Sequence, residues 1–81
     1  METRIAVIGS VVENEDSVER HKEILHEYRS YIIGRMGIPY RQKNMSIISI
    51  AVDAPTDAIS ALTGKIGKLE GVSSKTAYAK A

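Results

Sequence analysis

Two stretches of the chain are apolar at odd and even positions alike, which is the pattern of β-strands covered on both faces. They span residues 4–12 and 45–53. Residues 31–38 are also apolar but are interrupted by glycines and closed by Pro39, and residues 72–78 are largely polar. Because proline cannot donate to a strand ladder, and polar strands suit solvent, the pattern predicts two central strands and two edge strands.

Apolar residues recur at helical spacing in the two stretches between these strands. The first helix is predicted from Asp16, with Glu19 completing a capping box, to about Ser30. Its core stripe comprises Val18, Leu25, Tyr28 and Ile32, with Ile24 at the margin. The second helix is predicted to open at Pro55 and to end at Gly71 in a left-handed cap. Its stripe comprises Ile59, Leu62, Ile66 and Leu69.

The order of elements is therefore strand, helix, strand, strand, helix, strand. The two most apolar strands come first and third, where a ferredoxin-like fold places its central strands. We predict one α+β domain over residues 1–81, a βαββαβ sandwich with a four-stranded antiparallel sheet and two helices on one face.

The second face of that sheet also carries apolar residues, although an open antiparallel face usually reads polar. An 81-residue chain without cysteine has one small core and no disulfide to support it. We therefore expect a homo-oligomer, a dimer or a tetramer, formed through this face. The residues expected there are Ile8, Ser10, Met45, Ile47 and Ser49.

Composition narrows the function classes. The formal net charge is +1, and the aromatic residues are four tyrosines, without phenylalanine or tryptophan. Direct nucleic-acid binding is therefore not expected, because it needs a basic field or stacking platforms. The lack of cysteine, of a signal peptide pattern and of a long apolar run predicts a cytoplasmic protein without membrane attachment.

Residues with metal or catalytic chemistry are sparse. His26 lies on the charged face of the first predicted helix, whereas His21 lies within its core stripe. His21 could sense pH or contact a ligand, or it could be a buried histidine with a hydrogen-bond partner, which is the interpretation we favour. Two histidines five residues apart do not converge on a metal, so neither a metal nor a cofactor is expected.

No arrangement for catalysis is evident. The serines lie on predicted strands, and none occupies a nucleophile elbow. The acidic residues of the 13–16 loop suit the start of a helix, and a loop without glycine does not cradle phosphate. The glycines at 64 and 67 lie within a helical pattern, where they are expected to allow close packing. We therefore predict that the protein is not an enzyme.

The segment from Gly34 to Arg41 is the best candidate for binding an effector or a partner. Two interpretations stay open, a binding surface and a solvated edge that charge protects from aggregation. The candidate residues here are Arg35, Met36, Gly37, Tyr40 and Arg41, to which His21 is added from the helix.

The stretches at residues 4–7, 32–40, 47–50, 53–57 and 69–75 together resemble the iron-only hydrogenase system regulators. The resemblance implies an ACT-like fold, similar to the C-terminal half of nickel-responsive repressors, which assembles through its sheets. It also implies a regulatory role in the expression or maturation of iron-only hydrogenase. The 13–16 loop lacks the glycine typical of amino-acid-binding ACT domains, and the chain lacks the cysteine of the nickel sites and a separate DNA-binding domain.

We therefore expect a non-catalytic regulatory module that acts through oligomerisation and through an effector or a regulatory protein partner. The alternative is a nucleic-acid-binding ferredoxin-like module. In that alternative the third strand would carry stacking aromatics, but it offers Met45, Ile47 and Ser49.

Overall fold

The strand order follows from which strands are most apolar. The structure is a computed structural model that describes residues 2–80. The elements in chain order are β1 (Arg4–Val12), α1 (Glu15–Glu27), β2 (Ile32–Tyr40), β3 (Met45–Ala54), α2 (Thr56–Gly67) and β4 (Val72–Tyr78). The sheet order is β2-β3-β1-β4, with every neighbouring pair antiparallel. The predicted ferredoxin-like α+β fold, with the first and third strands central, is confirmed.

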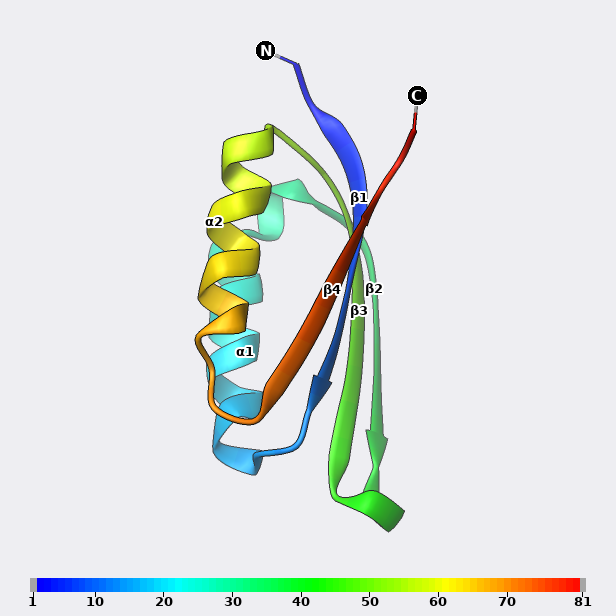
Figure 1. Cartoon of the computed structure of the whole chain (residues 1–81), viewed down its shortest axis with the longest axis vertical. Helices are drawn as coiled ribbons and strands as arrows, with labels where there is room; N and C mark the ends of the chain where they lie inside the picture. The colour runs from blue at the N-terminus through cyan, green and yellow to red at the C-terminus, as the bar shows by residue number, and fades with distance from the viewer. Residues whose placement is uncertain (1, 81) are drawn as a thin grey trace.

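Both helices lie on one side of the sheet, and the other side is bare (Figure 1). The buried core lies between the sheet and the helices, because alternate residues of each central strand point to that side. It comprises Ala6, Ile8, Val12, Leu25, Ile48, Ile50, Val52, Ala54, Ile59, Leu62 and Ile66. Three of the four residues predicted for the stripe of α2, Ile59, Leu62 and Ile66, are therefore in the core, whereas Leu69 lies beyond the end of the helix and is half-buried.

The start of α1 differs from the prediction. The N-cap is Asn14, whose side chain accepts a hydrogen bond from the Asp16 backbone N–H at 2.9 Å. Glu15 and Asp16 lie in the first turn, where their charge complements the helix dipole. Asparagine is as good an N-cap as aspartate, so the acidic run concealed which residue caps the helix. The helix ends at Glu27, and a short 3-10 turn at residues 29–31 precedes β2.

The loop before β4 also differs. Gly71 adopts the left-handed conformation, as predicted, with φ 71°. It does not end the helix, however, because α2 stops at Gly67 with Lys68 as its C-cap. Gly71 instead accepts a hydrogen bond from the Glu13 backbone N–H at 2.8 Å through its carbonyl. The loop between α2 and β4 is thus fastened to the loop between β1 and α1.

The two glycines near the end of α2 do not provide close packing, contrary to the prediction. A Cβ atom added to Gly64 or Gly67 would meet no atom within 4 Å. Both residues face open space and are exposed.

Edge strand β2 is longer than predicted and contains Pro39, which pairs with Ser46. An edge strand tolerates proline because its outward N–H groups have no ladder partner. The register shifts at Ile33, which forms a bulge near the start of the strand. The turn into β3 ends at Asn44, whose φ of 53° is left-handed, a conformation that asparagine tolerates.

Candidate functional site

The bare side of the sheet carries a row of exposed apolar side chains. We call it the open sheet face, and its large members are each 36–49% exposed: Ile5, Val7 and Val11 from β1, Met36, Ile38 and Tyr40 from β2, and Ile47 from β3. The strand register brings them into rows across the sheet, as in Ile38 opposite Ile47 and Ile47 opposite Val11. Contiguous exposed apolar surface of this kind marks interaction sites on folded domains.

The structure places the residues expected on this face on opposite sides of the sheet. Met45, Ile47 and Ser49 alternate with the buried positions of β3 and therefore lie on the open side. Ile8 and Ser10 are 1% and 3% exposed and point under the helices. Because β1 is apolar at both sets of positions, its alternation carried no sign of which set faces the helices.

Charge is nearly absent from the open sheet face. Among the strand positions with this orientation, only Asp53 and Lys75 are charged, one near an end of β3 and one on edge strand β4. The centre of the face is shallow, because Gly9 pairs with Ser49 there. A Cβ atom built on Gly9 meets nothing within 4 Å, so the space above it is free.

The candidate segment around Gly34 to Arg41 is divided between two surfaces. Arg35 and Gly37 pair with the inward-facing Ile50 and Ile48 and so lie on the helix side, whereas Met36 and Tyr40 lie on the open side. Strand alternation prevents these residues from forming one site. The Tyr40 hydroxyl donates to Gln42 Oε1 at 2.7 Å within its own turn.

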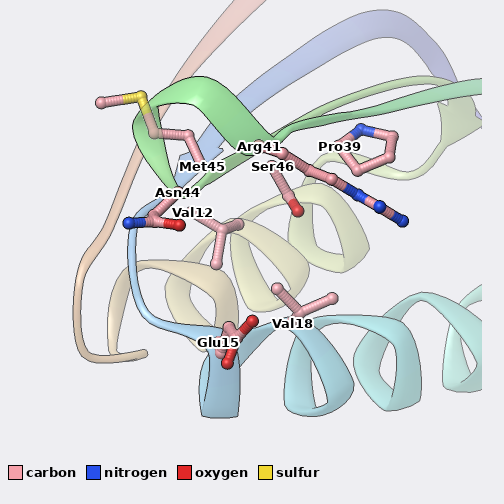
Figure 2. Close-up of a pocket in the computed structure, with 8 residues that line it drawn as sticks. All are labelled: Val12, Glu15, Val18, Pro39, Arg41, Asn44, Met45 and Ser46. Atoms are coloured by element: carbon pink, nitrogen blue, oxygen red, sulfur yellow. The ribbon is translucent and has the colours of Figure 1, made fainter.

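Arg41 lines a small hollow at the end of the sheet, between the first turn of α1 and the turn that joins β2 to β3. Figure 2 shows Glu15 and Val18 projecting from α1 toward Val12 and Ser46, while the Met45 side chain points away from the helix. The hollow measures about 150 Å³, which is below the usual size of a ligand pocket.

A larger hollow runs between α1 and β2. We call it the α1/β2 groove, and it is lined by Lys22, Leu25, His26, Arg29, Ile32 and Arg35. Its volume is about 490 Å³, within the range of small-molecule sites. Lys22 and His26 lie four residues apart on one stripe of α1, and Arg29 follows in the 3-10 turn after the helix. A second hollow of about 240 Å³ shares Lys22 and Arg35 and continues past Gly37 and Pro39.

His21 is buried in the core, as the helical stripe predicted, with 1% of its surface exposed. Its Nε2 lies 3.3 Å from the Ser10 hydroxyl, and its Nδ1 has no hydrogen-bond partner within residues 2–80. Burial is the main cause that lowers the pKa of His21, and the nearby Arg35 charge adds to it. The hydrogen-bond partner expected for a buried His21 is therefore the Ser10 hydroxyl.

Ser10 and His21 are a nucleophile and a base in type, but both are enclosed by the core. Neither side chain lines any of the hollows described above, so the pair reads as a structural hydrogen bond. Within the described residues no three potential metal ligands gather at one place. In the same part of the chain, no helix has the length and apolar character that a membrane crossing requires.

Lys22 and Arg29 were not predicted as site residues. Their spacing with His26 was visible in the sequence, but a charged helix stripe is usually solvated, and only the fold shows that Arg35 faces it from β2. The open-face residues of β1 were missed because β1 is apolar at both alternating sets of positions, so the pattern did not indicate which set faces the helices.

This arrangement of strands and helices defines a ferredoxin-like α+β domain. The chain belongs to the TM1266-like family, described as "Iron-only hydrogenase system regulator, putative", which it matches over residues 4–76. The family resemblance seen in the sequence is thereby confirmed.

Two solved structures place the chain among known proteins. The uncharacterized protein TM1266 from Thermotoga maritima is 36% identical, with a TM-score of 0.93 over 98% of this chain and 100% of that one. A formyltetrahydrofolate deformylase from Pseudomonas putida KT2440 is 15% identical, with a TM-score of 0.64 over 90% of this chain and 28% of that one. The second likeness shows the fold alone. No curated protein matches the chain.

Proposed function

We propose that this chain is a non-catalytic regulatory subunit of the iron-only hydrogenase system, which pairs with a second copy through its open sheet face and responds to an effector or a partner protein. Membership of the regulator family supports the system and the regulatory role. The observation that carries the pairing is the bare apolar face, whose large side chains are 36–49% exposed.

A second copy is the occupant that suits this face best. A symmetric pair brings the same patch together from both chains, so the patch must tolerate its own charge. The open sheet face carries almost no charge, and therefore offers little to a strongly charged partner. Burial of apolar surface is the main favourable term in association. The shallow centre at Gly9 leaves room for a side chain of the facing copy.

The absence of catalysis in this proposal rests on the placement of the reactive groups. The Ser10 hydroxyl and the His21 ring are enclosed by the core. The α1/β2 groove presents cations, His26 and aliphatic side chains, and within the described residues its lining includes no hydroxyl, thiol or carboxylate group. Such a groove can bind a ligand and leave it unchanged.

The pairing is tested by the mass of the protein in solution, measured by light scattering after size exclusion. Val7→Lys places a charge in the middle of the open sheet face, where burial without a partner charge is costly. We expect the wild type to be a dimer or a tetramer and Val7→Lys to be monomeric with an unchanged circular dichroism spectrum.

Ser60→Lys is the matched control, because it adds the same charge at an exposed position of α2. This variant should keep the wild-type mass. A wild type that is monomeric at roughly 100 µM, where pairs with a Kd of about 10 µM or tighter are mostly associated, would contradict the pairing. A Val7→Lys protein that still assembles would contradict the use of this face.

The regulatory role is tested in the cells that make this protein. Deletion of its coding sequence is expected to change hydrogenase activity, the amount of hydrogenase transcript, or both. A change in transcript indicates control of expression, and a change in activity alone indicates control of maturation. If both stay at the wild-type level under hydrogen-producing conditions, the proposed role is wrong.

A further inference from the structure

The α1/β2 groove concentrates positive charge that the chain neutralises only in part, at Lys22. Lys22, Arg29 and Arg35 all line it, together with His26. The nearest carboxylate to Lys22 is that of Glu19, 3.7 Å away on the exposed helix surface. Within residues 2–80, neither arginine has a carboxylate within 4.0 Å. Three permanent cations facing one hollow repel one another, and an anion between them relieves that repulsion.

The groove also has an apolar floor. Leu25 is buried, and Ile32 is half-buried at the start of β2. The cations stand around this floor from three elements: Lys22 from α1, Arg29 from the 3-10 turn that follows it, and Arg35 from β2. A pocket with an apolar body and a few convergent charged groups is typical of sites for small organic ligands.

Arg35 is the residue best placed to fix the ligand. It lines the groove and also the adjoining hollow that leads past Gly37. Its guanidinium can donate two parallel hydrogen bonds to a carboxylate or a phosphoryl group. Arg29 contributes less freely, because its Nη1 already donates to the His26 carbonyl at 2.8 Å.

We infer that the α1/β2 groove binds a small organic anion, whose carboxylate or phosphoryl group is held by Arg35, Lys22 and Arg29 and whose apolar part lies over Leu25 and Ile32. This inference deepens the effector half of the proposed function and does not depend on the pairing of the sheets. It names the chemical class of the effector.

The test is a titration followed by the NMR shifts of backbone amides, at constant ionic strength set with chloride. The probes are inorganic phosphate, succinate, acetate and hexanoate. We expect saturable shifts confined to α1 and the first half of β2. Phosphate against succinate distinguishes a phosphoryl from a carboxylate ligand. Hexanoate should bind about tenfold more tightly than acetate, because its methylene groups are partly buried on the floor.

Arg35→Gln removes the charge and the guanidinium fork but keeps the first methylene groups of the side chain and a polar end. Arg35 is exposed, so the fold should survive the change. We expect affinity for the tightest probe to fall about tenfold, the usual effect of losing a hydrogen bond between charged groups. Lys68→Gln is the matched control, because it removes one exposed charge beyond the end of α2. It should leave the affinity unchanged.

Several results would overturn the inference. These are shifts spread over the whole chain, equal weakening by Lys68→Gln and Arg35→Gln, and hexanoate binding no more tightly than acetate. A single-stranded oligonucleotide that binds more tightly than every small anion, with affinity falling steeply as salt rises, would make the groove a nucleic-acid surface instead.

The same titration on Val7→Lys separates the two proposals. Retained binding in a monomeric variant supports a groove that is complete in one chain. Loss of binding there would overturn the inference as stated. A wild type that is monomeric and still binds the probes would contradict the pairing and leave the groove supported.

Discussion

At the scale of single residues, His21 is the titratable group most enclosed by the fold. It is 1% exposed, lies beside Ser10, and has its pKa lowered by burial first and by the Arg35 charge second. The folded chain therefore resists protonation of this ring below the ordinary pKa of 6.5, while the unfolded chain accepts the proton. More protons bound by the unfolded state means lower stability as pH falls.

We predict that the contribution of His21 to the free energy of unfolding is constant above about pH 6.5 and declines from there toward pH 5. Urea denaturation at a series of pH values measures it. His21→Leu, which removes the titrating ring, should flatten the decline. His26→Gln changes an exposed histidine on the same helix and should retain the wild-type dependence. Equal slopes in the wild type and His21→Leu would show that other groups cause it.

The sequence allowed the burial of His21 to be predicted but not its partner. Helical spacing placed the ring among Val18, Leu25 and Tyr28, which requires only the 3.6-residue period. The Ser10 partner depends on which face of β1 turns inward, and β1 is apolar on both. Because the wrong set of β1 residues was assigned to the helix side, the hydrogen bond between α1 and β1 was not predicted.

At the scale of elements, Gly71 shows how two loops depend on one backbone conformation. Its φ of 71° is strained for any residue with a side chain, and an added Cβ would lie 2.9 Å from the Asn14 Cβ. Asn14 caps α1, and Ser17 in the first turn donates to the Glu70 carbonyl at 2.7 Å. A change at Gly71 therefore disturbs the start of α1 as well as the start of β4.

We predict that Gly71→Ala lowers the free energy of unfolding by about 2 kcal/mol or more, from left-handed strain and from the contact with Asn14. Gly64→Ala is the matched control in α2, where an added Cβ meets open space. It should raise stability by about 0.5–1 kcal/mol through helix propensity. Thermal and urea denaturation of both variants measure the difference, and two alanine variants of equal stability would refute it.

The elements themselves were largely predictable, and their ends were not. The apolar runs and helical stripes located all four strands and both helices. The cap at Asn14, the end of α2 at Gly67 and the passage of β2 through Pro39 depend on contacts between loops or on exposure at a sheet edge. Local pattern carries no information about such contacts.

At the scale of the whole molecule, the sheet has one face buried by its own helices and one face bare (Figure 1). If the folded chains pair, as proposed, mass action stabilises the folded state and the melting temperature depends on protein concentration. The unfolding enthalpy of a dimer of this size, at about 0.7 kcal/mol per residue, gives a rise of about 4 °C for each tenfold increase in protein.

Scanning calorimetry or circular dichroism measures this rise in melting temperature at protein concentrations from about 5 to about 500 µM. This range of roughly two decades spans common dimer affinities. Val7→Lys should melt at a temperature that does not change with concentration. A wild-type melting temperature that is equally constant would argue that the chain folds and functions alone.

The α1/β2 groove could not have been predicted from the sequence, because it lies between elements that become neighbours only in the folded chain. Lys22 lies on α1 and Arg29 in the turn after it, but Arg35 reaches them only after β2 takes its place at the sheet edge beside α1. The apolar second face, by contrast, was visible as soon as both central strands were seen to lack polar alternation.

The hydrogen bond between His21 and Ser10 also carries positional information. Strands that are apolar on both faces can slide by one residue against their neighbours at little hydrophobic loss, so hydrophobicity alone specifies the alignment of β1 weakly. Such a slip would present Gly9 or Val11 to the imidazole in place of the hydroxyl, and a core nitrogen would lose its only partner within the described chain. One polar contact thus helps to specify the register of β1, because it forms only in the correct register and is lost after a slip of one residue.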